Sequence, residues 1–428
     1  MVAIVSGRYP PDEYTTVELD INGLGDVESR AALVRIRDAG DMFWWFYPCV
    51  NSSRASSRPI VLWLDGVIGI PPSLLANFGM FGPYDINMNR RDDSWVDNYN
   101  LLFVDAPLGT GFSAATSDDA IPDTLEGNTE HLVYVLESFY SLHEGYRDAP
   151  LYIFGQGHGS QLALSLAVRL NEIDNEYNSL TGVVLGNGIV SPALAMTKLG
   201  FYLEELGYID ANGREAIETL SNETNYSVKN GDMVVAFDRF LSLDQFVNEN
   251  AGAIAVNLNH IVEKLTRADT DYFGQWRYLI GLSRSNLDLH DFMDSTVAPA
   301  LGIDRDVGYD QQKEAAIQAF SRSFMVPSIN KVEYLLNNTE CKVIIYNGNL
   351  DAVSNTPGQL EWVNNLQWPG KEEFSNSARE VFVVNQQIEG YFRITDRLRF
   401  YWMNVAGQSV PLDSPVAMRR FLELITGS

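Results

Sequence analysis

The residues with the clearest chemical pattern lie in a glycine-rich turn that follows an apolar run and opens a helical stretch. Residues 150–166 read PLYIF-GQGHG-SQLALSL. Such a turn can hold the pyrophosphate of a dinucleotide at a helix N-terminus, which requires the fingerprint G-x-G-x-x-G/A. The third glycine is replaced by Ser160, and the next strand-like run ends in Asn187 instead of an acid. We therefore predict no dinucleotide site.

The same turn fits the frame G-x-S-x-G of a nucleophile elbow, which lifts a reactive side chain out of a strained turn. Gly155, Gly157 and Gly159 fill this frame, with glycine at the position of the nucleophile. Glycine adopts a strained backbone without steric cost, so we expect the turn to form without its reactive hydroxyl. His158 follows the central position, and its simplest role is a hydrogen bond in the mouth of a cleft.

Metal and thiol chemistry have weaker support in the sequence. The chain has no H-E-x-x-H motif, no cysteine pair at zinc spacing and no P-loop, so we expect no metal and no cofactor. The two cysteines, Cys49 and Cys341, allow either one disulfide bond or two buried thiols, because spacing alone does not bring them together.

Composition excludes several classes of partner. The 428 residues include 30 Lys and Arg against 56 Asp and Glu, a formal net charge of −26. This charge argues against nucleic acid and anionic lipid, because both bind basic surfaces. No run of about 18 apolar residues is present, so we expect no membrane span.

Short apolar runs alternate with helical patterns. Strand-like runs lie at 32–50, 60–66, 100–109, 150–159, 181–188, 341–351 and 379–387, with helical patterns at 124–145, 160–173 and the C-terminus. This alternation predicts an α/β fold with a mostly parallel central sheet flanked by helices. A ligand crevice is expected where the strands end.

The sequence pattern changes between about residues 197 and 325. Helical patterns dominate there, including residues 255–268, and no strong strand pattern occurs. We therefore predict a core formed by residues 1–196 and 326–428, interrupted by a helical cap at 197–325.

Several longer strings resemble the serine carboxypeptidase family, and most closely its retinoid-inducible branch. They are MFWWFYP, IVLWLDGVIG, FGMFGP, NLLFVDAPLGTGFS, PLYIFGQGHGS, VVLGNGIVSP, VIIYNGNLDAVSNTPGQLEWVNNLQWPG and FYWMNVAGQSVPLDSP. They occur in order over most of 42–196 and 326–427, whereas the predicted cap matches loosely. The resemblance implies an α/β-hydrolase fold with a helical cap insertion.

The resemblance also places the family's catalytic triad on this chain, where two members have changed. The elbow serine of G-E-S-Y-G falls on Gly157, and the histidine of A-G-H-M-V-P falls on Gln408. The triad aspartate is retained as Asp351. In α/β-hydrolases the histidine follows this acid along the chain, yet all five histidines here precede it.

The former oxyanion and carboxylate pocket has changed as well. The family's loop N-G-G-P-G reads DGVIG here, from Asp65 through Gly66 and Val67, and the glutamate of the elbow becomes Gln156. In the family, that asparagine and glutamate bind the terminal carboxylate of a peptide. An ionised Asp65 would repel this carboxylate, and Val67 places a branched side chain where the backbone must approach the oxyanion. His158 completes the set of predicted pocket residues.

Acyl transfer needs a nucleophile, a base and oxyanion donors, and all three are affected. We therefore predict a catalytically inactive homologue without catalytic residues, kept for a binding or structural role. A small apolar ligand in the former cleft is one alternative, and a protein partner of the surface is another. The competing class is a hydrolase or acyltransferase rebuilt around Asp65, His158 and Asp351.

Localisation and partners are implied by the resemblance. Family members enter the secretory pathway, so we expect a secreted or lysosomal chain that begins near its mature N-terminus, with a homodimer as a further possibility. The first residues contain no signal peptide pattern. The candidate N-glycosylation sites are Asn51, Asn222, Asn225 and Asn337.

Overall fold

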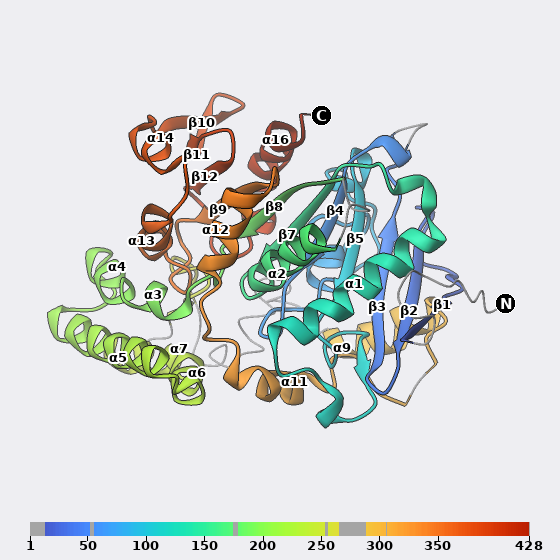
Figure 1. Cartoon of the computed structure of the whole chain (residues 1–428), viewed down its shortest axis with the longest axis horizontal. Helices are drawn as coiled ribbons and strands as arrows, with labels where there is room; N and C mark the ends of the chain where they lie inside the picture. Colours follow the sequence, from blue (N-terminus) through green and yellow to red (C-terminus); the bar gives the residue numbers. More distant parts are fainter. Residues whose placement is uncertain are drawn as a thin grey trace. The chain divides into compact units, whose positions relative to one another are not determined.

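The computed structural model of the chain describes residues 13–51, 55–173, 179–252, 256–264, 288–304 and 306–427. The described residues divide into two compact units. The first unit draws on 1–155, 165–183 and 280–320, and the second on 156–164, 184–279 and 321–428. Figure 1 labels the helices and strands of both.

The first unit is built on strands in the order β1-β2-β3-β5-β4-β7. The strands β1, β2, β3 and β5 pair antiparallel, whereas β4 runs parallel to both β5 and β7. Trp44, Trp45 and Trp63 are fully buried in the core of this unit. The bounds are β1 Tyr14–Glu18, β2 Arg30–Ile36, β3 Gly40–Tyr47, β4 Ile60–Leu64, β5 Asn100–Asp105, β6 Ala114–Ala115, β7 Leu151–Gln156, the π-helix η2 Leu75–Phe81 and α1 Leu125–Leu142.

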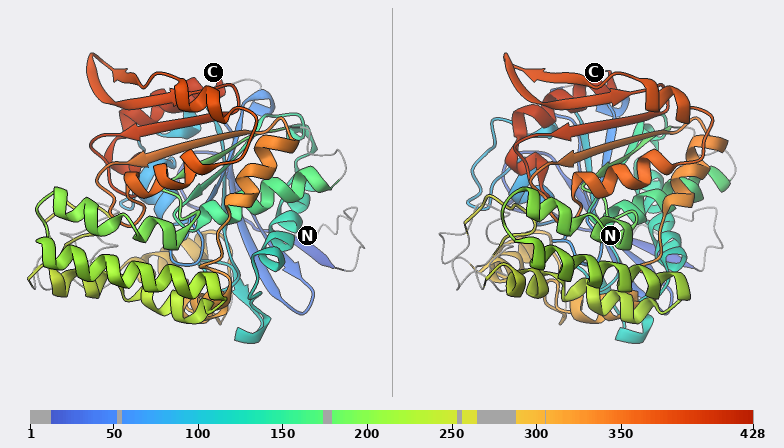
Figure 2. Two further views of the ribbon diagram at one scale, coloured as in Figure 1. Left: turned by 60° about the vertical axis from the view of Figure 1, so that its left-hand side comes forward. Right: turned by 90° about the vertical axis from the view of Figure 1, so that its left-hand side faces the viewer.

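The second unit contains strands in the order β9-β12-β11-β10, with β9 and β12 parallel and the other pairs antiparallel. Figure 2 shows these strands in red and orange. The ring of Phe421 on α16 packs edge-on against Tyr401 of β12, with centroids 4.8 Å apart. The bounds are β9 Lys342–Gly348, β10 Glu380–Val384, β11 Gln387–Ile394, β12 Leu398–Met403, α3 Pro192–Met196, α12 Ile329–Asn338, α13 Thr356–Asn365, α14 Lys371–Asn376, α15 Val410–Asp413 and α16 Pro415–Thr426.

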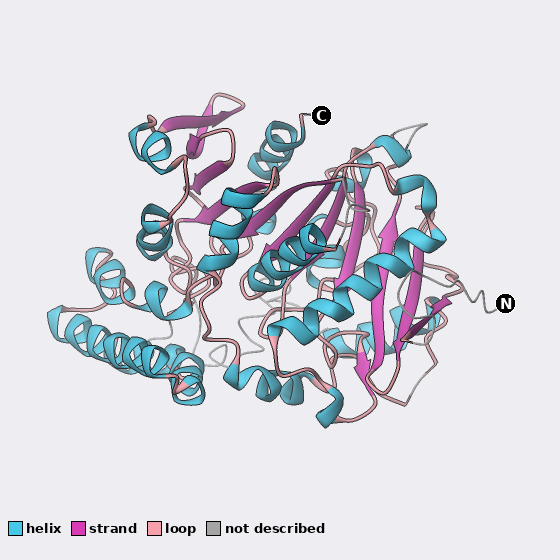
Figure 3. Ribbon diagram, in the orientation of Figure 1, coloured by secondary structure: helices cyan, strands magenta, loops and turns pink. Residues whose placement is uncertain are grey.

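Among the elements named here, β7, β8 (Leu180–Gly186) and α2 (Gly159–Glu172) contribute residues to both units. The predicted alternation of strands and helices is confirmed by the order of the elements along the chain. Figure 3 distinguishes the two kinds of element by colour. The sheet is mixed, because antiparallel strands accompany the parallel ones in each unit.

The described residues between 197 and 325 are mainly helical. Helices α4 (Leu199–Glu205), α5 (Ala211–Asn230), α6 (Met233–Leu241) and α7 (Leu243–Asn250) belong to the second unit. Helices α9 (Leu289–Phe292), α10 (Ala298–Ala300) and α11 (Lys313–Ala319) belong to the first.

The prediction of a helix over 255–268 is wrong for its described part, residues 256–264, which form turns and a single bridge between Val256 and Lys264. The physical reason is long-range pairing. The Ala352 N–H donates to the Leu258 carbonyl at 2.8 Å, and the Ile261 N–H donates to the Leu350 carbonyl at 2.9 Å. These bonds hold the turns of this segment against the 350–352 loop and override its local helical pattern.

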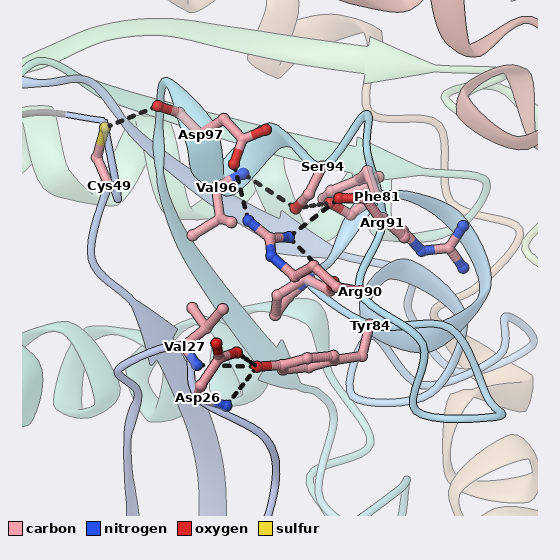
Figure 4. A network of polar contacts seen from close by, with 11 residues as sticks. Asp26, Val27, Cys49, Phe81, Tyr84, Arg90, Arg91, Ser94, Val96 and Asp97 are labelled. Carbon is pink, nitrogen blue, oxygen red and sulfur yellow. Dashed lines mark hydrogen bonds and ion pairs between the residues drawn. The ribbon is translucent and has the colours of Figure 1, made fainter.

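A polar network in the first unit fixes the loop after η2 (Figure 4). The Tyr84 hydroxyl accepts hydrogen bonds from the backbone N–H groups of Asp26 and Val27, at 2.6 and 2.8 Å, and donates to the Asp26 carboxylate. Arg90 and Asp97 form an ion pair at 2.8 Å within the same network. The Tyr84 hydroxyl thereby satisfies two backbone N–H groups that would otherwise lose their water partners.

Both cysteines are buried thiols, so the disulfide alternative is wrong for this structure. The Cys49 sulfur lies 3.5 Å from the Asp97 carbonyl oxygen, and the Cys341 sulfur lies 3.6 Å from that of Lys342. None of the helices that the structure describes combines the length and apolar character needed to cross a bilayer.

Candidate active site

The glycine-rich turn forms the predicted elbow between β7 and α2. Gly157 has φ +54°, a left-handed conformation that favours glycine. Its N–H donates to the Gly186 carbonyl at 3.1 Å, and its carbonyl accepts the N–H of Ile189 at 2.9 Å. The strained turn is therefore hydrogen-bonded to the end of β8, although Gly157 at its centre has no side chain.

The structure brings two of the predicted triad positions together. A Cβ atom built on Gly157 would meet the Gln408 side-chain nitrogen at 3.6 Å, an ordinary contact distance. Gln408 is half-buried, and its backbone N–H donates to the Asn259 carbonyl at 2.8 Å. Its carboxamide can donate and accept hydrogen bonds but does not titrate near neutral pH. An amide thus occupies the place where the elbow would need a base.

Asp351 is fully buried, and its carboxylate has partners in the second unit. One oxygen accepts from the Asn187 amide at 2.9 Å and from the Ser354 hydroxyl at 2.5 Å. The other accepts from the backbone N–H groups of Val353 and Ser354. Burial raises the pKa of Asp351 to about 6, against the opposing effect of the Ser354 and Asn187 hydrogen bonds. The acid is held by neutral donors.

A histidine absent from the predicted site reaches the loop that carries Gln408. The His260 Nε2 atom lies 3.7 Å from the Asp413 carboxylate, which also accepts the Gly407 N–H at 2.8 Å. A Cβ on Gly407 would meet atoms of His260 at 2.8 Å, so only glycine fits beside this ring. The pair packs around the loop before Gln408.

The two residues that flank Gly157 are both buried. The Gln156 amide donates to the Ser409 hydroxyl at 3.4 Å. The His158 ring stacks on Phe324, with ring centroids 4.7 Å apart and planes within 16°. Burial lowers the pKa of His158 to about 3, so its imidazole is neutral at physiological pH.

The predicted oxyanion loop belongs to the first unit and follows β4. The Trp63 indole N–H donates to the Asp65 carboxylate at 2.8 Å, and both Asp65 and Val67 are buried. Gly66 adopts φ +76°. The loop is fastened at its end by Lys313, whose ammonium donates to the Gly69 carbonyl at 2.5 Å.

Lys313 belongs to a buried polar group in the first unit. It lies 3.3 Å from the Asp310 carboxylate, which also accepts the Gly111 N–H at 2.9 Å. Burial lowers the pKa of Lys313, and the Asp310 charge acts against this shift. Among the described residues, no group of three or more His, Cys, Asp and Glu side chains is arranged to hold a metal ion.

The candidate glycosylation sites lie at different depths. Asn222 and Asn225 are on α5, exposed and half-buried respectively, and Asn337 is exposed on α12. Asn51 is exposed at the end of a described stretch, and the rest of its sequon lies outside the described residues.

Sequence reasoning missed the groups that surround the predicted site. Asn187 and Ser354 bind the retained acid, His260 packs beside the Gln408 loop, and Lys313 fastens the loop after β4. Asn187 had a signal, because it ends a strand-like run, and Ser354 lies only three residues after Asp351. His260 and Lys313 are single polar residues far in sequence from the loops that they contact.

The fold defined by these elements is the α/β-hydrolase fold. It matches the crystal structure of the prohormone-processing carboxypeptidase Kex1 of Saccharomyces cerevisiae with a TM-score of 0.81 and 19% identity, covering 96% of this chain and 95% of that chain. The fold-class prediction is therefore confirmed.

The family follows from sequence comparison. The profile described as "Serine carboxypeptidase" (Peptidase_S10) matches residues 22–427, so the chain belongs to the S10 serine carboxypeptidase family. It is 28% identical over 414 residues to the retinoid-inducible serine carboxypeptidase of Rattus norvegicus, covering 92% of this chain and 90% of that protein. It is also 28% identical to the venom serine carboxypeptidase of Apis mellifera, covering 90% and 80% respectively.

The raised pKa of Asp351 predicts a measurable pH dependence of stability. The unfolded acid ionises near its ordinary pKa of 3.8, whereas the folded acid keeps its proton to about pH 6. Stability therefore falls as the pH rises from about 4 to 6, by about 3 kcal/mol from this residue. Asp351→Asn should flatten the urea-unfolding free energy over this window by a similar amount. The exposed control Asp119→Asn should keep the wild-type slope, and parallel curves for all three proteins would contradict the assignment.

Proposed function

We propose that this chain is a catalytically inactive member of the serine carboxypeptidase family, with a binding or structural role. The observation that carries this proposal is the elbow itself. Gly157 keeps the strained conformation, and the group that its missing side chain would face is the amide of Gln408, 3.6 Å away. A triad needs a hydroxyl and a titratable ring at these positions.

The other two positions that are catalytic in the family, the acid and the oxyanion loop, support the same proposal. Asp351 is engaged by Asn187 and Ser354, so it does not need an imidazole to satisfy its buried carboxylate. Val67 is fully buried in the loop where the family places oxyanion donors. We infer that the fold has been kept while acyl transfer has been lost.

We further propose a small apolar ligand beside the former elbow. In the second unit His158 is neutral and stacks on Phe324, which in turn contacts Phe237 and Phe240 at centroid distances of 5.1 and 5.0 Å. These groups offer no charge for the carboxylate of a peptide terminus. They favour burial of an apolar molecule.

A second function has one specific observation in its favour. His260 and Asp413 form a histidine–aspartate pair next to the loop that carries Gln408. A pair of this kind can serve as a general base when a nucleophile is within reach. The alternative is therefore a hydrolase or acyltransferase with a rebuilt site.

The setting proposed for the chain follows its family. We propose a secreted or lysosomal glycoprotein that is able to form a homodimer, with a helical cap at 197–325. The name of the venom serine carboxypeptidase relative supports an extracellular setting. A protein partner of the surface is the alternative to the apolar ligand.

A fluorophosphonate probe for activated serines separates the inactive protein from the rebuilt hydrolase. We expect no labelling of the native chain, because an activated hydroxyl needs both an elbow and a base. An active serine carboxypeptidase is the positive control, and the heat-denatured chain is the negative control. Stoichiometric labelling that disappears on denaturation would reject the inactive assignment.

Restoring two triad residues should not restore peptidase activity. We expect no C-terminal trimming of a peptide by the Gly157→Ser, Gln408→His double variant, because Asp65 and Val67 still alter the carboxylate and oxyanion loop. Serine at φ +54° also adds about 1–3 kcal/mol of strain. Circular dichroism checks that the variant folds, and measurable release of C-terminal residues, followed by mass spectrometry, would refute the prediction.

Native mass spectrometry tests the apolar ligand. Protein purified from its natural source should carry a reproducible mass increment that organic solvent removes. The Phe324→Ala variant should lose it, because the ring that stacks on His158 is removed. Val416→Ala, at a half-exposed valine on α16, is the matched control and should retain the increment. Wild-type protein that is consistently empty contradicts this part of the proposal.

A further inference from the structure

The second unit contains a groove lined by residues in or next to helices α4, α5 and α13, all labelled in Figure 1. Its volume is about 460 Å³, within the range of about 300–1,000 Å³ that small-molecule sites occupy. None of its lining residues belongs to the elbow, the Asp351 loop or the Gln408 loop. An inference about this groove is therefore independent of whether acyl transfer has been lost.

The charges that line the groove are paired with one another. Arg214 of α5 contacts the Glu218 carboxylate at 2.6 Å. On the opposite wall, Lys198 lies 3.3 Å from the Glu361 carboxylate of α13. Arg214 also contacts the carboxylate of Glu204, which does not line the groove, at 2.8 Å. Each charge of the lining therefore already has an opposite partner, and a charged ligand would have to displace one of these partners.

The same groove presents an aromatic ring and an aliphatic side chain. Phe201 is 40% exposed, and the Arg214 guanidinium lies 5.5 Å from the centroid of its ring. Leu360 of α13 is half-buried and also lines the groove. A purely apolar ligand would fit this surface but would strip water from the two ion pairs, which is unfavourable.

We propose that this groove binds a neutral saccharide. A pyranose ring has an apolar C–H face that can pack on Phe201 and Leu360, and hydroxyl groups that both donate and accept hydrogen bonds. The paired side chains of Lys198 and Glu361, and of Arg214 and Glu218, supply donors and acceptors at the two walls. Such a ligand uses both properties of the groove without separating either ion pair.

The sugar can come from solution or from the chain itself. Asn222 and Asn225 follow Glu218 by four and seven residues on α5, so they continue the same face of the helix. A glycan on either asparagine would start within about two helical turns of the groove. The chemistry is the same for both sources, and they can be separated experimentally.

Saturation-transfer NMR with N,N′-diacetylchitobiose tests the site. The full chain with Asn222→Gln and Asn225→Gln keeps the groove without an attached glycan. At about 10 mM probe, a site with a millimolar Kd is mostly occupied, so we expect transfer to the C–H protons of the sugar. Phe201→Ala in this background should weaken binding about tenfold or more, because the stacking face is lost. Leu206→Ala is the matched control, since Leu206 is 50% exposed next to α4 and does not line the groove.

Charged sugars test whether the groove prefers a neutral saccharide. Glucosamine and N-acetylneuraminic acid should bind more weakly than chitobiose, and Glu361→Gln should leave chitobiose binding within about threefold while improving that of the anionic sugar. The proposal is overturned by absent transfer, by binding that Phe201→Ala does not change, or by preference for a charged probe.

Chitobiose binding by the wild-type protein from a glycosylating host, compared with binding by the double asparagine variant, identifies the source of the saccharide. If the chain's own glycan occupies the groove, free chitobiose binds only after the two asparagines are replaced. If the ligand is a soluble saccharide, chitobiose binds the glycosylated wild-type chain as well. Either result supports a saccharide site, and each assigns it to one source.

Discussion

The left-handed backbone of Gly157 is the constraint around which the second unit is arranged. A parallel strand must turn directly into α2 there, and the turn is stable because its N–H and carbonyl groups bond to Gly186 and Ile189. Those partners continue from β8 and thereby fix where Asn187 and Asp351 lie. The turn is needed to connect strand and helix even when no reaction takes place on it. This explains how the elbow can persist without a nucleophile.

Asp351 has a structural role that needs no histidine partner. A buried carboxylate without a cation is unfavourable, and the rise of its pKa to about 6 reports that penalty. Asn187, Ser354 and the local backbone supply four donors, which compensate the burial and join two segments of chain. Replacement of the carboxylate would leave these donors unsatisfied. The acid is thus retained by its neighbours in the absence of an imidazole to orient.

The sequence predicted the strands well because buried strands carry continuous apolar runs, such as those of β4, β5 and β9. It also predicted the meeting of Gly157 and Gln408, since the family resemblance fixes both loops. It failed for residues 256–264, where hydrogen bonds to the 350–352 loop override a helical pattern. Lys313 escaped detection because a single lysine has no periodicity, and its partner, the Gly69 carbonyl, is 244 residues away.

The groove between α4, α5 and α13 is also a feature that the sequence did not predict. Phe201, Glu218 and Glu361 come from three helices, and no local pattern relates them. Each is unremarkable alone: an exposed ring and two carboxylates in ion pairs of helix surfaces, which add little stability. Together, however, they can select a ligand, because paired charges around an exposed ring distinguish ligands by hydrogen-bond geometry and by contact with the ring. Recognition of a neutral ligand by such a groove depends little on the net charge of the acidic chain.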